Sequence, residues 1–303
     1  MKNMKTAAGM LCLAGILSLG MGTTVFAEDG DSHYPVTITT YNYENEPVEM
    51  TFEKAPEKVF AYANSNIEEL LALGLGDKIV AAYGLDGDVR EDLKDEFDKI
   101  QYMDTKPSKE EVVAMEPDFI AAWYSSFSDD WLSDVSFWQE RDVNTYMSLN
   151  SSAKGPASEF PRTIEDEYED ILNLGKIFDC EDKAEEIVDQ MKGEIDKVKE
   201  HVEGTDPLSV AVLEDEGDSF RVYGTETLGG NIPETLGAEL KLGAENSENV
   251  GAEDLIAADP DVLFMINYDG FMTADEAIAD ITDNPAYAVS YTHLRAHETR
   301  HDL

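Results

Sequence analysis

Three histidines at the end of the chain have the residue type and the spacing of a metal site. The sequence ends in VSYTHLRAHETRHDL, in which His293, His297 and His301 lie four residues apart. On a helix this spacing places the imidazoles along one face, where they could bind zinc or iron. The whole sequence holds 5 histidines, so this segment is the first candidate for a functional centre.

The rest of the sequence offers little metal-binding or catalytic chemistry. The other histidines are His33 and His201, and neither is placed to enter a binding cleft. We therefore expect no bare transition-metal site and no histidine ligation of haem, whereas tyrosine ligation of haem stays open. Ser125 and Ser126 lack a histidine partner, and no GxSxG, HExxH or phosphate-loop pattern occurs. The sequence thus predicts no enzyme, no catalytic residue and no cofactor.

Residues 1–27 predict a secretory signal peptide. MKNMK is basic, AAGMLCLAGILSLGMG is apolar, and a small-x-small pattern ends at Ala27. The apolar run is too short for a stable membrane span. Cys12 lies within this run without a leucine three residues earlier, so a lipid anchor is not evident. We expect an extracytoplasmic protein, secreted or associated with the cell surface.

Charge and cysteine content exclude further classes of protein. The formal net charge is −43, and such a surface repels nucleic acid and anionic lipid head groups. No nucleic-acid partner is expected. Without the leader, Cys180 is the only cysteine, so no internal disulfide can form.

The sequence repeats itself at the level of secondary-structure elements. SKEEVVAMEPDFIAAW (108–123) matches GAEDLIAADPDVLFMI (251–266), and each reads as a short acidic helix followed by Pro-Asp and an apolar run. Pro117 and Pro260 end the helices, since proline cannot continue a helix interior. The apolar runs after them predict strands buried on both faces, as in a parallel sheet.

A second echo completes each half. NSNIEELLALGLGDKIVAAYG (64–84) is similar to GGNIPETLGAELKLGA (229–244), and the apolar runs KVFAYA (58–63) and LSVAVLE (208–214) come before them. Each half therefore reads as strand, loop, helix, helix and strand, which predicts an α/β fold with two lobes.

A helical connection is expected between the halves, over residues 163–204. Its apolar residues from Ala184 to Val202 are spaced as one stripe on a helix. Residues 181–202 at a rise of ~1.5 Å give a helix of roughly 33 Å, long enough to span two lobes. A stiff connection of this kind predicts a small opening motion.

With these elements in place, the sequence resembles the extracytoplasmic substrate-binding proteins of ABC importers for ferric siderophores, haem and cobalamin. PEKVFAYANSNIEELLALGLGDKIVAAYG, PSKEEVVAMEPDFI and GAEDLIAADPDVL carry the resemblance, which covers residues 34–288. It implies two Rossmann-like lobes, a rigid spanning helix and a ligand held in the central cleft. It also implies that one surface glutamate of each lobe docks on the membrane permease. Glu110 and Glu253 match this role, because each lies seven residues before its Pro-Asp proline; an acid in a first helical turn is also favoured by the helix dipole alone.

In a fold of this kind the ligand is expected at the connections between the ends of strands and the helices that follow them. Aromatic, amide and hydroxyl side chains at these positions suit a bulky organic chelate, although each is also compatible with ordinary packing. Arg221 could meet an anionic ligand or pair with one of the many acidic residues. The expected ligand-binding residues are Asn64, Ser65, Asn66, Tyr83, Trp123, Tyr124 and Tyr146 in the first lobe, and Arg221, Tyr223 and Tyr268 in the second.

The end of the chain is expected to be non-native. VSYTHLRAHET (289–299) resembles one reading frame of the transposase end used in sequencing-library adapters, and RHDL follows it. Residues 205–288 also give the second lobe fewer residues than residues 28–162 give the first, so we expect that lobe to be truncated. We therefore assign no metal site and no function to the three terminal histidines.

The sequence thus predicts a solute-binding protein that captures an iron–siderophore-like chelate and delivers it to an ABC importer. Its expected partners are the permease and the chelate, and it is expected to act as a monomer. Alternatives are a haem or cobalamin binding protein of the same importer family, or a sensor or adhesion ectodomain on the same fold. The expected segments are a signal peptide (1–27), an N-terminal lobe (28–162), connecting helices (163–204), a C-terminal lobe (205–288) and the tail (289–303).

Overall fold

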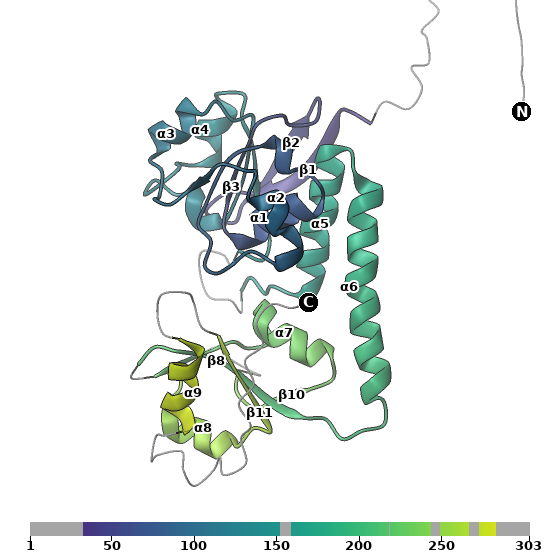
Figure 1. Ribbon diagram of the computed structural model, residues 1–303, viewed down its shortest axis with the longest axis vertical. Helices are drawn as coiled ribbons and strands as arrows, with labels where there is room; N and C mark the ends of the chain where they lie inside the picture. Colours follow the sequence, from purple (N-terminus) through teal and green to yellow (C-terminus); the bar gives the residue numbers. More distant parts are fainter. Residues whose placement is uncertain (1–32, 152–158, 218, 244–248, 267–272, 283–303) are drawn as a thin grey trace, which may run out of the picture. The chain divides into compact units, whose positions relative to one another are not determined.

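A computed structural model describes residues 33–151, 159–217, 219–243, 249–266 and 273–282 (Figure 1). The expected signal peptide, Tyr268 and the histidine-containing tail lie outside these residues. In the described part of the chain, no helix is both long and apolar enough to cross a membrane.

The first lobe is built on a parallel sheet of five strands in the order β5-β4-β3-β6-β7. Val59, Phe60 and Ala61 in the central strand are fully buried, and so are all four residues of β6. Burial on both faces is typical of parallel strands covered by helices. The strands are β3 (Val59–Tyr62), β4 (Ile79–Tyr83), β5 (Tyr102–Met103), β6 (Phe119–Ala122) and β7 (Asn144–Met147). A separate antiparallel hairpin of β1 (Val36–Tyr41) and β2 (Pro47–Phe52) comes before them.

The helical connections of this lobe lead to strands on opposite sides of the central strand β3. α1 (Asn64–Ala72) connects β3 to β4 on one side, whereas the chain from β5 through α3 (Lys109–Ala114) returns to β6 on the other side of β3. The chain therefore reverses direction between β3 and β6. Such a reversal in an open α/β sheet is the place where ligands bind, outside the carboxyl ends of the strands. The short helices α2 (Lys94–Phe97) and α4 (Val135–Gln139) complete the lobe.

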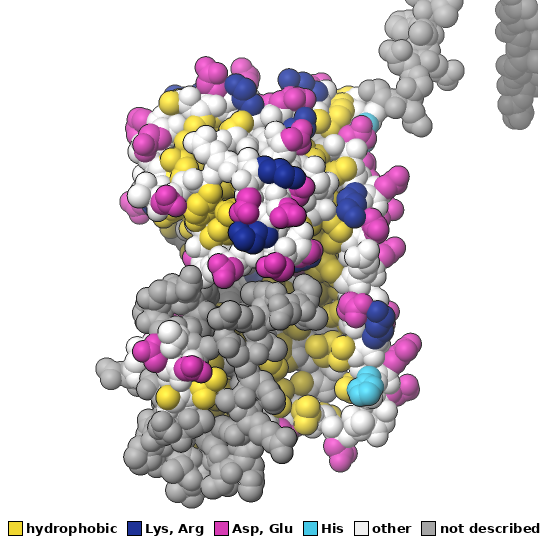
Figure 2. Space-filling model, in the orientation of Figure 1, with side chains coloured by type: hydrophobic (Ala, Val, Ile, Leu, Met, Phe, Trp, Pro, Cys, Tyr) yellow, Lys and Arg dark blue, Asp and Glu magenta, His cyan; other side chains and the backbone are white. Residues whose placement is uncertain are grey.

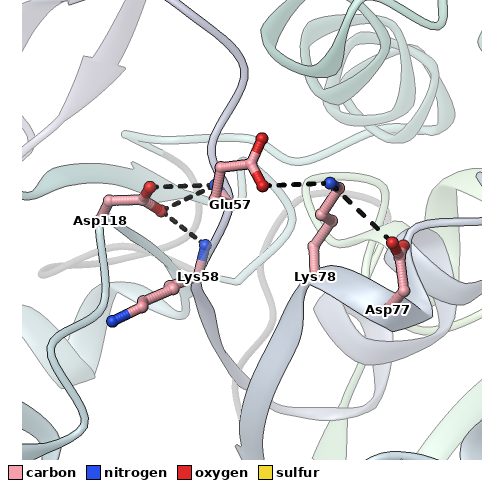
Figure 3. A network of polar contacts seen from close by, with 5 residues as sticks. All are labelled: Glu57, Lys58, Asp77, Lys78 and Asp118. Carbon is pink, nitrogen blue, oxygen red and sulfur yellow. Dashed lines mark hydrogen bonds and ion pairs between the residues drawn. The ribbon is translucent and has the colours of Figure 1, made fainter.

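The repeated Pro-Asp motif has a structural role at the opposite end of the central strands. Asp118 accepts hydrogen bonds from the backbone N–H groups of Glu57 and Lys58, at 3.0 and 2.8 Å, just before β3 (Figure 3). In the second lobe, Asp261 accepts from the backbone and hydroxyl of Ser209 at 2.9 and 2.7 Å. Each aspartate thus satisfies the start of the neighbouring parallel strand, which explains why the motif occurs in both halves.

Two long helices follow the first lobe, as the sequence predicts. α5 (Ile164–Phe178) ends at Asp179, which takes a left-handed conformation with φ 55°, and α6 (Glu181–Val202) begins two residues later. Gly175 allows close packing, because a Cβ at this position would lie 2.5 Å from the Cβ of Ala184. The first part of the apolar stripe on α6 packs on the first-lobe core, but Val198 and Val202 at its far end are exposed.

The second lobe has a smaller sheet that is only partly parallel. β8 (Ser209–Asp215) pairs in parallel with β10 (Glu239–Leu240) and β11 (Val262–Ile266). β9 (Phe220–Val222) is antiparallel to β8, which differs from the expected strand-to-helix connection. The reason is the turn after β8, where Gly217 has φ 89° and donates its N–H to the carboxylate of Asp215. The helices are α7 (Leu228–Thr235), α8 (Ala252–Ala258) and α9 (Ala274–Thr282). The predicted α/β class is confirmed.

Candidate functional site

The strongest candidate site lies at the carboxyl ends of β3 and β6, where the sheet reverses direction. Ser65 follows β3 and Trp123 follows β6, and the indole Nε1–H of Trp123 donates to Ser65 Oγ at 3.1 Å. This hydrogen bond joins the first turn of α1 to the residue after β6 across the reversal point. Both side chains are half-buried, so each keeps some surface for a ligand.

The backbone at the end of β3 is strained. Ala63 has φ 75° and ψ 155°, a region that is open to glycine but unfavourable for residues with a Cβ. Its N–H donates to the carbonyl of Tyr83 at 3.0 Å, so the end of β4 holds this conformation. The turn starts α1 at Asn64 and places Asn64 and Ser65 at the sheet edge. Strain of this kind costs about 1–3 kcal/mol and is concentrated at functional sites.

Four aromatic side chains form a cluster at this edge, which we call the aromatic cluster: Tyr62, Tyr83, Trp123 and Trp131. The Tyr62 ring is stacked on Tyr83 with 5.9 Å between centroids, and it meets Trp131 and Trp123 edge-on at 4.6 and 6.1 Å. Gly84 has φ 87°, and a Cβ at this position would clash with the Tyr62 ring. Glycine is therefore required beneath the cluster.

The electrostatics of the cluster favour neutral donors over charge. Burial raises the pKa of Tyr62, and the nearby Asp86 and Tyr83 add to the increase. Its phenol therefore stays protonated at neutral pH. One ammonium group, that of Lys106, lies 4.3 Å from the centroid of Trp131 and gives the cluster a cation–π contact. Asn64 accepts a hydrogen bond from the backbone N–H of Asp86 at 2.6 Å, which fixes its amide beside the cluster.

A second aromatic pair follows β6 directly. The rings of Tyr124 and Tyr43 are stacked at 5.8 Å with an interplanar angle of 3°. The backbone N–H of Tyr124 donates to Ser151 Oγ at 3.0 Å, and this hydroxyl donates to the Ser148 carbonyl after β7. Polar contacts therefore connect the segments that follow three neighbouring strands, β3, β6 and β7, beside half-buried aromatic rings.

Two of the expected ligand-binding residues are instead part of the interior. Asn66 and Tyr146 both have 0 % exposure. Asn66 donates to the Tyr62 carbonyl at 3.0 Å, and Tyr146 donates to Asp170 at 2.6 Å. Tyr146 lies within β7 rather than after it, and its side chain is in the core. We therefore remove both residues from the candidate ligand contacts.

In the second lobe, the expected residues Arg221 and Tyr223 both contact the carboxylate of Glu214. Arg221 lies opposite Glu214 on the antiparallel strands β9 and β8, with 3.6 Å between the guanidinium and the carboxylate. Tyr223 donates its hydroxyl to the same carboxylate at 2.7 Å, and Arg221 lies 5.2 Å from its ring centroid. Of the two alternatives for Arg221, pairing with an acidic residue is the one the structure shows. Asn231 accepts from the backbone N–H of Ile164 at 3.0 Å.

Sequence reasoning did not identify Tyr62, Trp131, Lys106 and Tyr43. Tyr62 could have been found, because it lies near the end of the apolar run 58–63 and is the last residue of β3. The other three come from loops and from the first hairpin, and no periodic pattern links them to the sheet edge.

The two expected docking glutamates have matching environments. Glu110 and Glu253 are both exposed and lie in the first turns of α3 and α8. In each case the acid that follows, Glu111 or Asp254, accepts from the backbone N–H group that comes before the helix. The following residue therefore stabilises the helix start, and the carboxylates of Glu110 and Glu253 stand at the surface.

Two groups of side chains among the described residues could hold a metal ion. One consists of His33, Asp179 and Glu181, and the other of Glu69, Glu167 and Asp170. Neither group includes a residue of the aromatic cluster.

Comparison with known proteins establishes the family. Residues 59–292 match the family model described as periplasmic binding protein, and the chain belongs to this family. A solved structure of a periplasmic binding protein from Veillonella parvula DSM 2008 is 31% identical, covers 86% of this chain and 81% of its own, and has a TM-score of 0.78. The resemblance inferred from the sequence motifs is thus confirmed.

Two further relatives give context. The uncharacterized ABC transporter substrate-binding lipoprotein YvrC of Bacillus subtilis (strain 168) is 28% identical over 206 residues, which is 65% of this chain and 59% of that protein's length. An ABC-type Fe³⁺-hydroxamate transport system structure from Saccharomonospora viridis DSM 43017 is 24% identical, covers 85% of this chain and 88% of its own, and has a TM-score of 0.67. The latter shows that the fold is shared.

Proposed function

We propose that this chain is the extracytoplasmic binding protein of an ABC importer and that it captures a bulky ferric chelate of the siderophore type. The observation that carries the proposal is the aromatic cluster at the reversal point of the first-lobe sheet. Membership of the periplasmic binding protein family supports a role in binding rather than catalysis.

The chemistry of the cluster favours an organic ring system over a bare ion. Trp123 and Tyr124 are half-buried, and stacking on aromatic rings of this kind stabilises planar aromatic or conjugated ligands. Neutral phenol, amide and hydroxyl groups add directional hydrogen bonds. Among the described residues, the ammonium of Lys106 is the cationic group found over a ring of the cluster, so a chelate with a small negative charge is better matched than a highly charged anion.

Delivery to a permease is the second part of the proposal. Glu110 and Glu253 offer one exposed carboxylate on equivalent helices of the two lobes. A relative is described as an ABC transporter substrate-binding lipoprotein, which supports both the importer partner and a location outside the cytoplasm. The leader expected over residues 1–27 supports the same location.

A titration of intrinsic tryptophan fluorescence tests the proposal. The chain has 3 tryptophans, and two of them, Trp123 and Trp131, belong to the aromatic cluster. A panel of ferric hydroxamate, ferric catecholate, haemin and cobalamin should include a ferric chelate that quenches the signal saturably. The iron-free chelator is the matched control and should bind more weakly.

The alternatives give different results in the same titration. Tight binding of haemin with a shifted Soret band, or of cobalamin, would replace the siderophore assignment with a related ligand. A chain that binds no member of the panel but is folded by circular dichroism would contradict the proposal and favour a sensor or adhesion role.

A further inference from the structure

A group of three carboxylates inside the first lobe has no use in the proposed ligand site. Glu69 lies on α1, and Glu167 and Asp170 lie on α5. One carboxylate oxygen of each residue lies within 4.8 Å of those of the other two. Glu69 and Asp170 have 7 % and 0 % exposure, so these groups are not solvated surface acids. We call them the buried acid group.

The hydrogen bonds around this group satisfy some of its oxygens and leave others without a donor. Asp170 accepts from the Tyr146 hydroxyl at 2.6 Å and from the Leu149 N–H at 2.9 Å. Glu167 accepts from the amide of Asn150 at 2.8 Å. Both carboxylate oxygens of Glu69 are buried and have no donor among the described residues.

Two neutral amide oxygens, one on a residue that contacts the group and one on the same helix as Glu69, are also without donors among the described residues. The amide oxygen of Asn150, whose nitrogen contacts Glu167, is buried and has no partner among the described residues. The same holds for the amide oxygen of Asn66, which lies one helical turn before Glu69. Acceptors that lack donors in an apolar interior are strongly unfavourable. A cation coordinated by several of these oxygens at once would remove this cost.

The spacing fits a hard divalent cation of calcium's size. Ca²⁺ binds oxygen ligands at about 2.3–2.6 Å, so two oxygens on one ion can lie up to about 5 Å apart. The three carboxylates lie within 4.8 Å of one another, which is compatible with Ca²⁺. Mg²⁺ usually keeps several waters and is seldom held by protein oxygens alone, so a buried group of protein oxygens favours Ca²⁺. An all-oxygen ligand set excludes a preference for soft metals.

We propose that the buried acid group binds one Ca²⁺ ion, with Glu69, Glu167 and Asp170 as carboxylate ligands and the Asn150 amide oxygen as a neutral ligand. The ion would fix α1 to α5. Because α1 begins at Asn64 in the candidate ligand site, this cross-link would also hold one wall of that site in place. This inference does not depend on which ligand the site binds.

Terbium luminescence tests the proposal directly. Tb³⁺ replaces Ca²⁺ in oxygen sites, and the ring of Tyr146, hydrogen-bonded to Asp170, is placed to sensitise its emission. The full chain is stripped with a chelator, titrated with TbCl₃ and then with CaCl₂. We expect one saturable site, displacement by Ca²⁺ at lower concentration than by Mg²⁺, and an increase of the unfolding temperature with Ca²⁺.

Matched variants separate this site from the acidic surface. Glu69→Gln keeps size and polarity but removes a charge, and Glu167→Gln does the same at the less buried position. Both should weaken Tb³⁺ and Ca²⁺ binding about tenfold or more, which is the loss of one charged ligand. Asp189→Asn on the exposed face of α6 should leave the affinity unchanged.

Two results would overturn the proposal. One is equal affinity in Glu69→Gln, Glu167→Gln and Asp189→Asn, which would mean that metal binds only to surface acids. The other is the absence of saturable binding in the wild-type chain together with a higher unfolding temperature for Glu69→Gln, which would mean that the three carboxylates share protons. If Glu69→Gln does not fold, the metal affinity of Glu167→Gln compared with that of Asp189→Asn decides whether the buried acid group binds the ion.

Discussion

The edge of the first-lobe sheet combines a strained backbone conformation with polar and aromatic side chains that lie outside the hydrophobic core. Ala63 is held in a conformation suited to glycine by its hydrogen bond to Tyr83. Neither its residue type nor its neighbours indicate a positive φ, so the sequence could not reveal it. Trp123 and Tyr124, by contrast, were predictable because they follow an apolar run that ends in a loop.

Replacing Ala63 with glycine should relieve backbone strain. Glycine adopts φ 75° at no steric cost, although it also gains freedom in the unfolded chain. We expect Ala63→Gly to stabilise the chain by about 1 kcal/mol, measured by urea unfolding. Ala72→Gly, in the last turn of the same helix, is the control and should destabilise. Destabilisation of equal size in both variants would contradict the strain.

The thiol of Cys180 should react slowly in the folded chain. Burial, followed by the charges of Glu181 and Asp179, raises its pKa to about 11. Thiolate is the reactive form, so alkylation by iodoacetamide at pH 8 should be tens of times slower than in urea and should accelerate as pH rises toward 11. Equal rates in the folded and unfolded chain would show that the thiolate is not disfavoured.

At the scale of elements, the sequence predicts the strands and helices that have a clear hydrophobic pattern and clear residues at their ends. The runs that form β4, β6 and β11 were identifiable because parallel strands covered by helices are continuously apolar. Only β6 is buried along its whole length; β11 is half-buried and Phe264 within it has 48 % exposure, so the expected burial on both faces was wrong for β11. α6 was predicted at its observed bounds because its stripe is uninterrupted. The antiparallel β9 and the hairpin β1–β2 were not predicted, since they depend on turns and pairings that a short segment does not specify.

The Pro-Asp motif should contribute stability through its aspartate rather than through surface ion pairs. Asp118→Ala leaves the N–H groups of Glu57 and Lys58 without their acceptor. We expect a loss of about 1–3 kcal/mol in the free energy of unfolding, and a smaller loss for Asp118→Asn, which keeps one oxygen. Glu57→Ala is the control in the same network, because it removes only an exposed pair to Lys78 at 3.5 Å. Similar losses in Asp118→Ala and Glu57→Ala would be contrary to this role.

At the scale of the whole molecule, charge dominates the surface. Acidic side chains are scattered over the visible first-lobe face, among uncharged side chains and some Lys and Arg (Figure 2), and the net charge of the sequence is −43. Because the sequence contains 65 acidic residues, their spacing does not single out particular ones, and the buried acid group was not predicted. Glu110 and Glu253 are distinguished only by equivalent positions in the two repeats.

Reversing the charge of the two docking glutamates should separate binding from delivery. Glu110→Lys combined with Glu253→Lys is expected to leave chelate affinity unchanged but to reduce uptake through the cognate importer about tenfold, since the two carboxylates proposed to make the contact are replaced by the opposite charge. Glu140→Lys, at another highly exposed acid, is the control for added positive charge. Uptake that falls equally in both proteins would argue against specific docking.

The most direct test of the proposed function compares chelate affinity in two tryptophan variants. Trp123 lies half-buried in the aromatic cluster, whereas Trp138 is a core residue with 1 % exposure. Trp123→Ala should weaken binding of the preferred ferric chelate about tenfold or more, the loss expected for a stacking contact, while Trp138→Phe should retain wild-type affinity. Unchanged affinity in Trp123→Ala, with the chain folded, would place the ligand elsewhere and contradict the proposed site.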